Sequence, residues 1–139
     1  MKILIFGLPG SGKTTLATEL SSKLNAIHFN ADEIREKYDD WDFSPEGRLR
    51  QAYRMKFLSD GAIIAGKKVI ADFVCPTEKT RSEFNADFYI WMNTISAGRF
   101  EDTNKIFEKP TKTDYIVEAW EDTTPDKIIK IINKKIGEN

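Results

Sequence analysis

The feature that most constrains the fold is a glycine-rich segment near the start of the chain. A short apolar run over residues 2–6 leads directly into it, and Thr15-Leu16-Ala17 continues it as a helix would. The segment itself reads Gly7-Leu8-Pro9-Gly10-Ser11-Gly12-Lys13-Thr14, which fits the pattern G-x-x-x-x-G-K-[ST] of phosphate-binding loops. The alternative interpretation, a glycine-rich turn with an incidental lysine, does not account for the strand before it and the helix after it.

Each residue type in this segment has a chemical reason to be there. Glycines let the backbone curl so that several N–H groups point at one anion, and the start of the helix adds the positive end of its dipole. The Lys13 ammonium can reach the β- and γ-phosphates of ATP, and the Thr14 hydroxyl can ligate magnesium. The sequence thus predicts ATP as co-substrate, Mg²⁺ as cofactor, Lys13 as a catalytic residue, and phosphate binding by Gly7, Leu8, Pro9, Gly10, Ser11, Gly12, Lys13, Thr14 and Thr15.

Composition limits the class of protein further. At 139 residues the chain is large enough for one sizeable core, so we expect residues 1–139 to form a single domain. A net charge of −1 gives no basic field for nucleic acid, and no apolar stretch is long enough to span a membrane. One cysteine excludes an internal disulfide framework and fits a reducing compartment. Because the chain opens on a core strand, we expect no signal peptide and a cytoplasmic location.

Strand-like and helix-like segments alternate along the whole chain. Right-handed crossovers between such segments give a parallel sheet covered by helices on both faces. The predicted fold class is therefore α/β, a three-layer P-loop NTPase fold of the nucleotide-kinase type with a five-stranded parallel sheet. Predicted strands cover residues 2–6, 26–29, 69–74, 87–92 and 115–117. Predicted helices cover residues 13–24, 32–38, 45–65 (with a stripe at Leu49, Tyr53 and Phe57), 78–84, and a last helix with an apolar stripe at Ile128, Ile129, Ile132 and Ile136.

A second group of candidate residues follows the strand 26–29, over residues 30–35. Open α/β sheets bind ligands at the carboxyl ends of their strands, so Asp32 is placed to face the γ-phosphate. A carboxylate there can accept a proton from an attacking hydroxyl or hold magnesium through water. Asp32 could instead cap the helix 32–38, which aspartate does well, and the two roles are compatible.

Several polar residues on other segments can be weighed in the same way. Asp72 interrupts an apolar strand near its end and is a second candidate for magnesium, beside Asp32. His28, the only histidine, lacks Cys or His partners, so the pattern favours a strand residue over a metal ligand or base. Arg48 and Gln51 start the helix 45–65 and could meet whatever Arg35 meets, whereas Arg50 is typical of a solvated helix face.

The segment 93–113 has no clear apolar period. A stretch of this length between strands is unusual unless it acts, for instance as a lid over phosphates. Cationic side chains there could neutralise charge on the transferred group; the alternative is a mobile surface loop. The candidate lid residues are Arg99, Phe100, Lys105 and Phe107.

At this point the sequence resembles the adenylylsulfate kinase (APS kinase) family over nearly its whole length. The family's Asp-Gly-Asp-Asn-x-Arg segment corresponds to residues 30–35, and its Gly-Phe-Ser-Pro-Glu-Asp-Arg-x-x-Asn stretch is closely matched by residues 42–51. The family's Phe-Ile-Ser-Pro corresponds to residues 73–76, with Arg81 at the spacing of the arginine that follows. A late Tyr-Glu-x-Pro corresponds to residues 107–110.

The resemblance implies an activity and a set of site residues. Such enzymes use ATP and magnesium to phosphorylate the 3′-hydroxyl of adenosine 5′-phosphosulfate, and family members often form homodimers. Asp32 would orient or deprotonate the hydroxyl, and Phe43 would stack on adenine, whose broad face suits an aromatic ring. The other substrate-binding residues would be Arg35, Arg48 and Gln51, with Val74, Cys75 and Pro76. Guanidinium groups suit an anionic substrate because they bind oxygens bidentately.

The sequence also departs from the family pattern. Cys75 replaces a serine that is phosphorylated in some members, so no phosphoenzyme is expected there, and a small buried filler is the favoured interpretation of this thiol. The family's Arg-Asp-x-Lys-Gly-Leu-Tyr run and its Phe-Thr-Gly have no counterpart in the short lid. Two alternatives therefore stay open: a related P-loop kinase with another hydroxyl acceptor (a nucleotide, a sugar derivative or a polynucleotide end), or a nucleotide-binding protein without catalysis.

Overall fold

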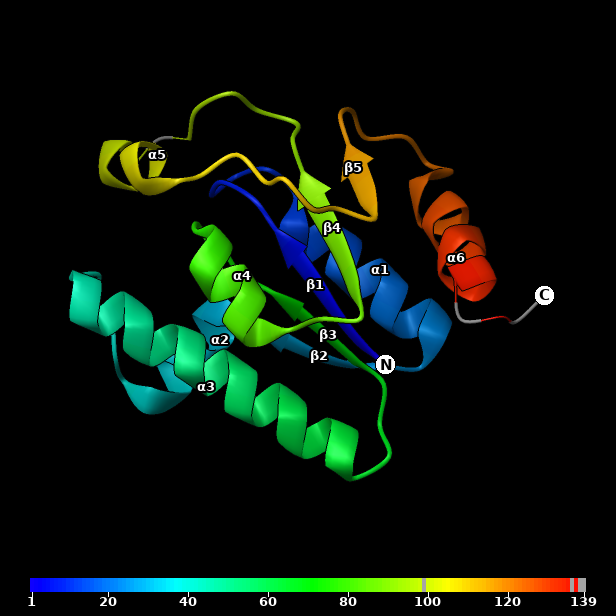
Figure 1. The fold of residues 1–139 in the computed structure, drawn as a ribbon, viewed down its shortest axis with the longest axis horizontal. Coiled ribbons are helices and arrows are strands. Elements are labelled where there is room, and N and C mark those ends of the chain that lie inside the picture. Colours follow the sequence, from blue (N-terminus) through cyan, green and yellow to red (C-terminus); the bar gives the residue numbers. More distant parts are fainter. Residues whose placement is uncertain (99, 136, 138–139) are drawn as a thin grey trace.

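A parallel sheet with helices on both faces forms the described part of the chain (Figure 1), which comprises residues 1–98, 100–135 and 137 in this computed structural model. The sheet has the order β2-β3-β1-β4-β5, and all four neighbouring pairs are parallel. Its strands are β1 (Lys2–Phe6), β2 (Ile27–Asn30), β3 (Val69–Asp72), β4 (Phe88–Met92) and β5 (Tyr115–Val117). The helices are α1 (Lys13–Leu24), α2 (Ala31–Tyr38), α3 (Pro45–Ile64), α4 (Glu78–Phe84), α5 (Glu101–Ile106) and α6 (Thr124–Lys135). The predicted fold class is confirmed.

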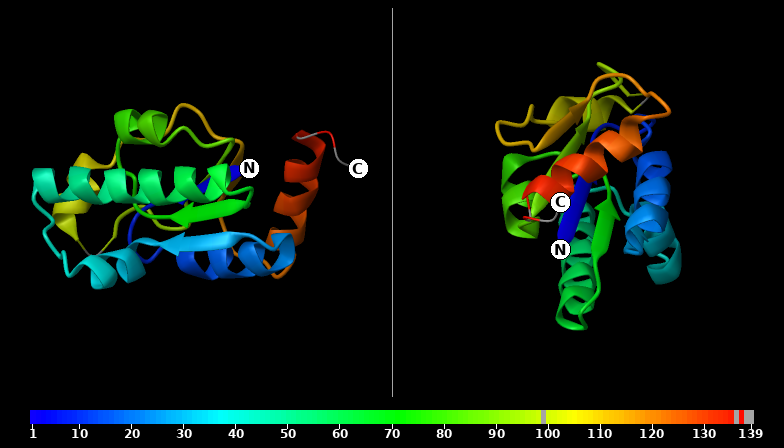
Figure 2. Two further views of the ribbon diagram at one scale, coloured as in Figure 1. Left: turned by 90° about the horizontal axis from the view of Figure 1, so that it is seen from below. Right: turned by 90° about the vertical axis from the view of Figure 1, so that its right-hand side faces the viewer.

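Alternation along the strands divides the core into two layers. In β1, Ile3 and Ile5 pack with α1 and α6, whereas Leu4 and Phe6 pack with the helices on the opposite face. The edge-on view in Figure 2 shows α1 and α3 on opposite sides of β2 and β3. Because successive strand side chains point to opposite faces, a strand covered on both sides must be apolar throughout. All five residues of β1 are buried accordingly.

Helix starts follow local capping chemistry, with one correction. Ser44 caps α3 by accepting from the Gly47 amide, with Pro45 next to it, as the sequence predicts. For α2 the cap is Asn30, whose side chain accepts from the Glu33 amide, so the expectation that Asp32 might serve only as a cap is wrong. The side chain of Asp32 is therefore left for another role.

Two sequence expectations differ from the structure in extent. The third strand ends at Asp72, two residues earlier than predicted, and the chain leaves the sheet after that residue. The segment 93–113 contains α5, which the sequence pattern did not indicate. Ile136, assigned to the stripe of the last helix, lies outside the described residues. Among the described helices, none combines the length and apolar character needed to cross a membrane.

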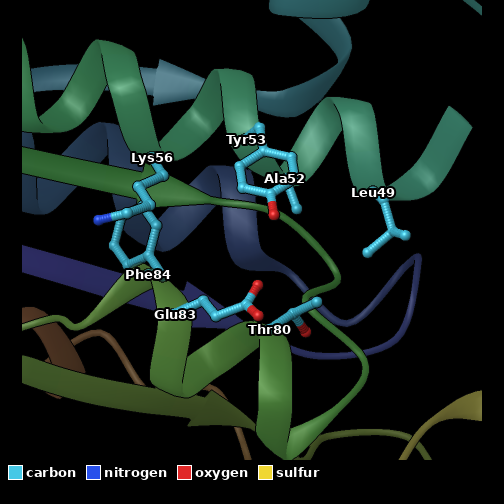
Figure 3. Close-up of a pocket in the computed structure, with 7 residues that line it drawn as sticks. All are labelled: Leu49, Ala52, Tyr53, Lys56, Thr80, Glu83 and Phe84. Carbon is cyan, nitrogen blue, oxygen red and sulfur yellow. The ribbon is translucent and has the colours of Figure 1, made fainter. Parts of the chain in front are cut away.

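Helix α3 does not pack on the sheet through its most apolar stripe. Met55 is fully buried against the sheet, whereas Tyr53 and Phe57 are exposed and stack on each other at 6.0 Å between ring centroids. The groove beside this stripe, between α3 and α4, is shown in Figure 3 and has a volume of only about 10 Å³. A cavity of that size admits about one water molecule, so it is no ligand site.

The two faces of α3 should differ sharply in their contribution to stability. We expect Met55→Ala to lower the free energy of unfolding by about 2–5 kcal/mol, because it removes a fully buried side chain and leaves a cavity. Phe57, which is 66% exposed, is the matched control, and Phe57→Ala should cost less than about 1 kcal/mol. Urea denaturation of both variants checks this. Equal losses would show that the exposed stripe is buried in solution.

Candidate active site

The phosphate-binding loop joins the end of β1 to the start of α1, at the carboxyl edge of the sheet. Gly12 caps α1 with a φ of 98°, a region of backbone conformation that favours glycine. Gly7 is needed for a different reason, since a Cβ built on it would lie 2.7 Å from the carbonyl oxygen of Met92 on β4. The two glycines thus allow the turn and its close approach to the neighbouring strand.

Lys13 lies against this loop and has a perturbed pKa. Its Nζ donates to the carbonyl oxygen of Leu8 at 3.0 Å. Burial lowers the pKa of the Lys13 ammonium from 10.5 to about 8, while the negative charges of Asp72 and Asp32 act in the opposite direction. The amine is therefore held close to the loop with a protonation equilibrium near neutral pH.

Thr14 and Asp72 meet where β3 ends beside α1. The Thr14 hydroxyl donates to Oδ1 of Asp72 at 3.2 Å, and Asp72 is only 2% exposed. A hydroxyl and a carboxylate are the oxygen ligands that Mg²⁺ prefers, so these two residues fit a magnesium ion bound together with phosphates. Among the described residues no group of three or more His, Cys, Asp or Glu side chains could hold a metal. That is compatible with magnesium, which is commonly held by one or two protein ligands plus substrate phosphates.

Asp32 lies in the first turn of α2 and is exposed. Burial lowers the pKa values of Lys13 and Arg35, and the negative charge of Asp32 opposes both shifts. The carboxylate is therefore within electrostatic range of both the phosphate-binding loop and the arginine three residues further along α2. Two segments that lie far apart in sequence, the loop after β1 and the helix after β2, contribute charges to the same region.

Arg35 supports the chain between α2 and α3. It is buried, and its Nη1 donates to the carbonyl oxygens of Asp40 and Asp42 at 2.9 and 3.2 Å. Its guanidinium lies against the Phe43 ring, with 4.2 Å between Cζ and the ring centroid. Much of Arg35 is thus engaged in shaping residues 39–44 and in supporting the exposed ring of Phe43, which is 53% exposed.

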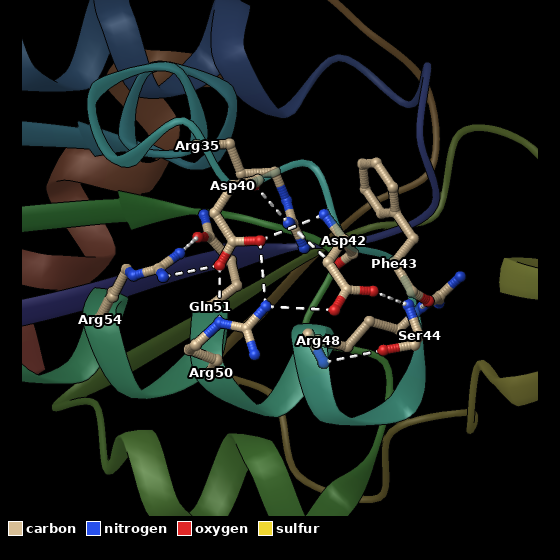
Figure 4. A network of polar contacts seen from close by, with 10 residues as sticks. Arg35, Asp40, Asp42, Phe43, Ser44, Arg48, Arg50, Gln51 and Arg54 are labelled. Atoms are coloured by element: carbon tan, nitrogen blue, oxygen red, sulfur yellow. Dashed lines mark hydrogen bonds and ion pairs between the residues drawn. The ribbon is translucent and has the colours of Figure 1, made fainter.

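Asp40 ties the same segment to α3 through two further arginines (Figure 4). Its Oδ2 accepts from Nε of Arg50 at 2.7 Å and from Nη2 of Arg54 at 2.6 Å. Hydrogen bonds from Arg50 and Arg54 hold the pKa of Asp40 well below its usual range. Arg50 is exposed, as predicted for a solvated helix face, but it also forms ion pairs with Asp40 and Asp42. No local sequence signal paired Asp40 with residues ten and fourteen positions later.

Arg48 and Gln51 have different surroundings although both were predicted to bind substrate. Arg48 donates from Nε to the Phe43 carbonyl at 2.8 Å, and its Nη2 lies 3.5 Å from Oγ1 of Thr103 on α5. Gln51 is buried and donates to the carbonyl oxygen of Ala31 at 2.9 Å, linking α3 to α2. Arg48 therefore lies between the segment 39–44 and the lid, whereas Gln51 lies in the packing between two helices.

The segment Val74, Cys75 and Pro76 follows β3 and is held by a buried arginine. Cys75 has a positive φ of 44°, and its carbonyl accepts from Nε of Arg81 at 2.9 Å. Nη2 of Arg81 donates to the carbonyls of Pro76 at 3.1 Å and Glu108 at 2.7 Å, so it joins this segment to the end of the lid. Burial raises the pKa of the Cys75 thiol to about 12, which makes it an unreactive filler at neutral pH.

The segment 93–113, the candidate lid, is attached directly to the phosphate-binding loop. The Thr94 hydroxyl donates to the Ser11 carbonyl at 2.8 Å. Phe107 packs on the core face that includes Phe6, whereas Phe100 and Lys105 are exposed. Arg99, the fourth candidate in the lid, lies outside the described residues.

A cavity of about 350 Å³ lies between the phosphate-binding loop, the end of β4 and the lid. Leu8, Trp91, Asn104, Phe107 and Lys109 are among its lining residues. It is large enough for a small organic ligand and combines apolar walls with a few polar groups. The sequence did not indicate that Trp91 lines a cavity, because this residue lies in an apolar strand whose pattern predicts a core position.

This geometry is that of a P-loop protein with a kinase-like fold: a phosphate-binding loop follows the first strand, a carboxylate follows the second, and the segment 93–113 follows the fourth. The family described as AAA domain matches residues 3–90, and the chain belongs to this family. A comparison of the sequence with curated proteins gives no match.

Solved structures with the same fold include kinases for different acceptors. An APS kinase from Mycobacterium tuberculosis, in complex with AMPPNP and APS, is 16% identical at a TM-score of 0.73, with 95% of this chain and 96% of that chain covered. A shikimate kinase from Aquifex aeolicus is 18% identical at a TM-score of 0.65, with 99% and 96% covered. A gluconokinase from Sinorhizobium meliloti is 11% identical at a TM-score of 0.66, with 98% and 91% covered. At such identities the likeness concerns the fold.

The lowered pKa of Lys13 predicts how nucleotide binding responds to pH. The ammonium is charged below about pH 8 and neutral above it, and the charged form attracts phosphates. Between pH 7.5 and 9, the Kd of ATP measured without metal should rise on the order of 10-fold. In the control Lys13→Met, which has no titrating amine, affinity should be low at both pH values and change little. A wild-type Kd that is the same at both pH values would contradict the prediction.

Proposed function

We propose that this protein is an ATP-dependent kinase that transfers the γ-phosphoryl group to a hydroxyl of a small molecule, with adenosine 5′-phosphosulfate as the first candidate acceptor. The observation that carries the proposal is the position of Asp32, an exposed carboxylate in the first turn of α2, directly after β2 and at the same edge of the parallel sheet as the phosphate-binding loop. A carboxylate at this place can orient and deprotonate an acceptor hydroxyl, a role that ATP binding alone does not require. The alternative role is to hold magnesium through water.

In this proposal the residues after β1 and β3 serve the donor. Backbone N–H groups of residues 7–15 and the Lys13 ammonium would bind the phosphates of ATP. Thr14 and Asp72 would hold magnesium, which neutralises charge on the β- and γ-phosphates when it is bound. Asp32 would accept a hydrogen bond from the acceptor hydroxyl, align its oxygen with the γ-phosphorus and take up its proton.

The acceptor side supports adenosine 5′-phosphosulfate through Phe43 and Arg48. The exposed ring of Phe43 offers one flat face to an adenine, since its other face rests on Arg35. Arg48 is cationic and lies between Phe43 and the lid, where an anionic group could bind. The APS kinase with the same fold was solved with AMPPNP and APS, which makes the same acceptor the first to test.

A second candidate function, phosphorylation of a different small hydroxyl compound, is favoured by the engagement of Arg35 and Gln51. Arg35 donates to two backbone carbonyls, and the buried Gln51 links two helices. Both would have to exchange these bonds in order to bind a phosphosulfate. An acceptor with fewer anionic groups, such as a sugar derivative, would need fewer cations.

A coupled assay for ADP release separates the two candidates. Purified protein with ATP and magnesium is offered adenosine 5′-phosphosulfate, nucleosides, shikimate, gluconate and other sugar derivatives in parallel. The leading proposal expects release with adenosine 5′-phosphosulfate and a 3′-phosphorylated product. Release with only another acceptor supports the second candidate, and release with none contradicts both.

Asp32 should contribute to the chemical step rather than to ATP binding. Asp32→Asn keeps the size of the side chain but removes its basicity, so kcat should fall by about 10²-fold or more while the Kd of ATP changes little. Glu33→Gln is the matched control, because Glu33 is the adjacent exposed carboxylate in the same helical turn. It should keep near-normal kcat. Equal losses of kcat and of ATP affinity in Asp32→Asn would assign Asp32 to metal binding or structure.

Phe43 should contribute to acceptor binding only. Phe43→Ala removes the exposed ring, and a lost base stack should weaken acceptor binding by roughly 1–3 kcal/mol without a change in the KM of ATP. Trp41→Ala is the control, because Trp41 is a similarly exposed aromatic residue in the same segment. If both variants keep the wild-type KM for the acceptor, Phe43 does not stack on it.

A further inference from the structure

Three side chains from two elements, Thr14 of α1 with His28 and Asn30 of β2, converge on the carboxylate of Asp72. In the parallel register Asn30 of β2 lies opposite Asp72 of β3, and His28 lies opposite Ile70. Side chains two residues apart on a strand point to the same face. Since Ile70 packs with α1, His28 and Asn30 both point to the face on which α1 begins with Lys13 and Thr14. The sheet register therefore brings His28 to the phosphate-binding loop although it lies 14 residues further along the chain.

The two oxygens of the Asp72 carboxylate share Asn30 as a partner, and each has one further partner of its own. Oδ1 of Asp72 accepts from the Thr14 hydroxyl and from Nδ2 of Asn30, both at 3.2 Å. Oδ2 contacts Nε2 of His28, with Asn30 at a longer 3.3 Å as its other partner. Asn30 Nδ2 also lies 3.0 Å from Oγ1 of Thr14. The carboxylate is thus held at both oxygens, one side toward the loop and the other toward β2.

His28 is the strongest restraint on the second oxygen. A carboxylate accepts hydrogen bonds, so Nε2 of His28 is the donor in this contact. Without that donor only the 3.3 Å contact from Asn30 would hold Oδ2, and the carboxylate could rotate away from Thr14. Groups that hydrogen-bond a metal-binding carboxylate fix its orientation and so tune the metal site.

We propose that His28 is a positioning residue of the magnesium–ATP site, which donates from Nε2 to Asp72 and holds that carboxylate aimed at the Thr14 hydroxyl. His28 itself touches neither the nucleotide nor the metal. It acts on the magnesium-dependent part of ATP binding, because Thr14 and Asp72 are the residues that fit magnesium. The inference rests on the proposed function in one respect, namely that the site binds ATP with magnesium.

The hydrogen bond can be tested without any nucleotide, because His28 is the only histidine in the chain. A long-range ¹H–¹⁵N spectrum of the ¹⁵N-labelled protein contains a single imidazole, so its two nitrogen resonances are those of His28. We expect a proton bonded to Nε2, with a resonance that shifts in the variant Asp72→Asn. A neutral ring protonated only at Nδ1, or a resonance indifferent to Asp72→Asn, would overturn the proposal.

The effect on the site is measured as ATP affinity by calorimetry, once with magnesium and once with a chelator. In His28→Ala the gain in affinity that magnesium provides should fall by about 10-fold or more, whereas affinity without magnesium should stay within about twofold. His28→Gln, whose side-chain amide can also donate, should restore most of the gain. Ile27→Ala is the control for disturbance of β2, since Ile27 is exposed on the same strand, and it should behave as wild type.

The remaining outcomes are decisive as well. A magnesium gain that is unchanged in His28→Ala overturns the proposal, and so does an equal loss of affinity with and without magnesium, which would mean a purely structural role. If the wild-type protein binds ATP no better with magnesium, the proposed function fails and this inference fails with it. The imidazole spectrum separates a failure of the proposed function from a failure of the hydrogen bond. It reports the His28–Asp72 contact independently of nucleotide, so the contact can be present even if magnesium has no effect on ATP binding.

Discussion

The position of β1 is the constraint on which the rest of the site depends. It is the middle strand of the sheet, with β3 on one side and β4 on the other, and it is buried on both faces. Its carboxyl end therefore cannot move without disturbing both core layers. The phosphate-binding loop follows β1 directly, so its start is fixed in position by that strand. Gly7 lets the loop pass within contact distance of the Met92 carbonyl on β4. Asp72 ends β3 and Met92 ends β4, so these two residues lie on either side of the loop.

On the proposed acceptor side, several arginine side chains bond to the protein's own backbone and carboxylates. Arg35, Arg50 and Arg54 all bond to the segment 39–44, either to its carbonyls or to Asp40. This segment has no helix or strand of its own, so its shape depends on these bonds. Phe43 owes its position to the same network, since its ring rests on Arg35 and its carbonyl accepts from Arg48. If the proposed acceptor binds there, its recognition depends on an intact charge network that the acceptor itself need not touch.

The sequence predicts those features that depend on neighbours along the chain. The phosphate-binding loop, the cap at Ser44 and the buried strands are local patterns, and they lie where the sequence predicts them. The Asp40 network and the His28–Asp72 contact could not be predicted, because they join residues 10 to 44 positions apart through a register that no local pattern defines. Helix α3 shows that an apolar stripe does not by itself identify the buried face. Its buried face carries Gly47, Gln51 and Ser59 beside Met55, and the more apolar stripe is exposed.

The two halves of the proposed site differ in how they are built, and this difference bears on specificity. The donor half consists of groups at the ends of adjacent strands, joined by hydrogen bonds to the buried Asp72. The acceptor half consists of the segments 39–44, 74–76 and 93–113, which connect helices and strands. Connecting segments tolerate change better than strand ends do, so new acceptors can be accommodated while the donor half is kept. Such a division allows one fold to serve different acceptors. Kinases for APS, shikimate and gluconate share this fold at 11–18% identity to this chain. Acceptor identity is therefore better sought in Phe43, Arg48 and the cavity beside Trp91 than in the phosphate-binding loop.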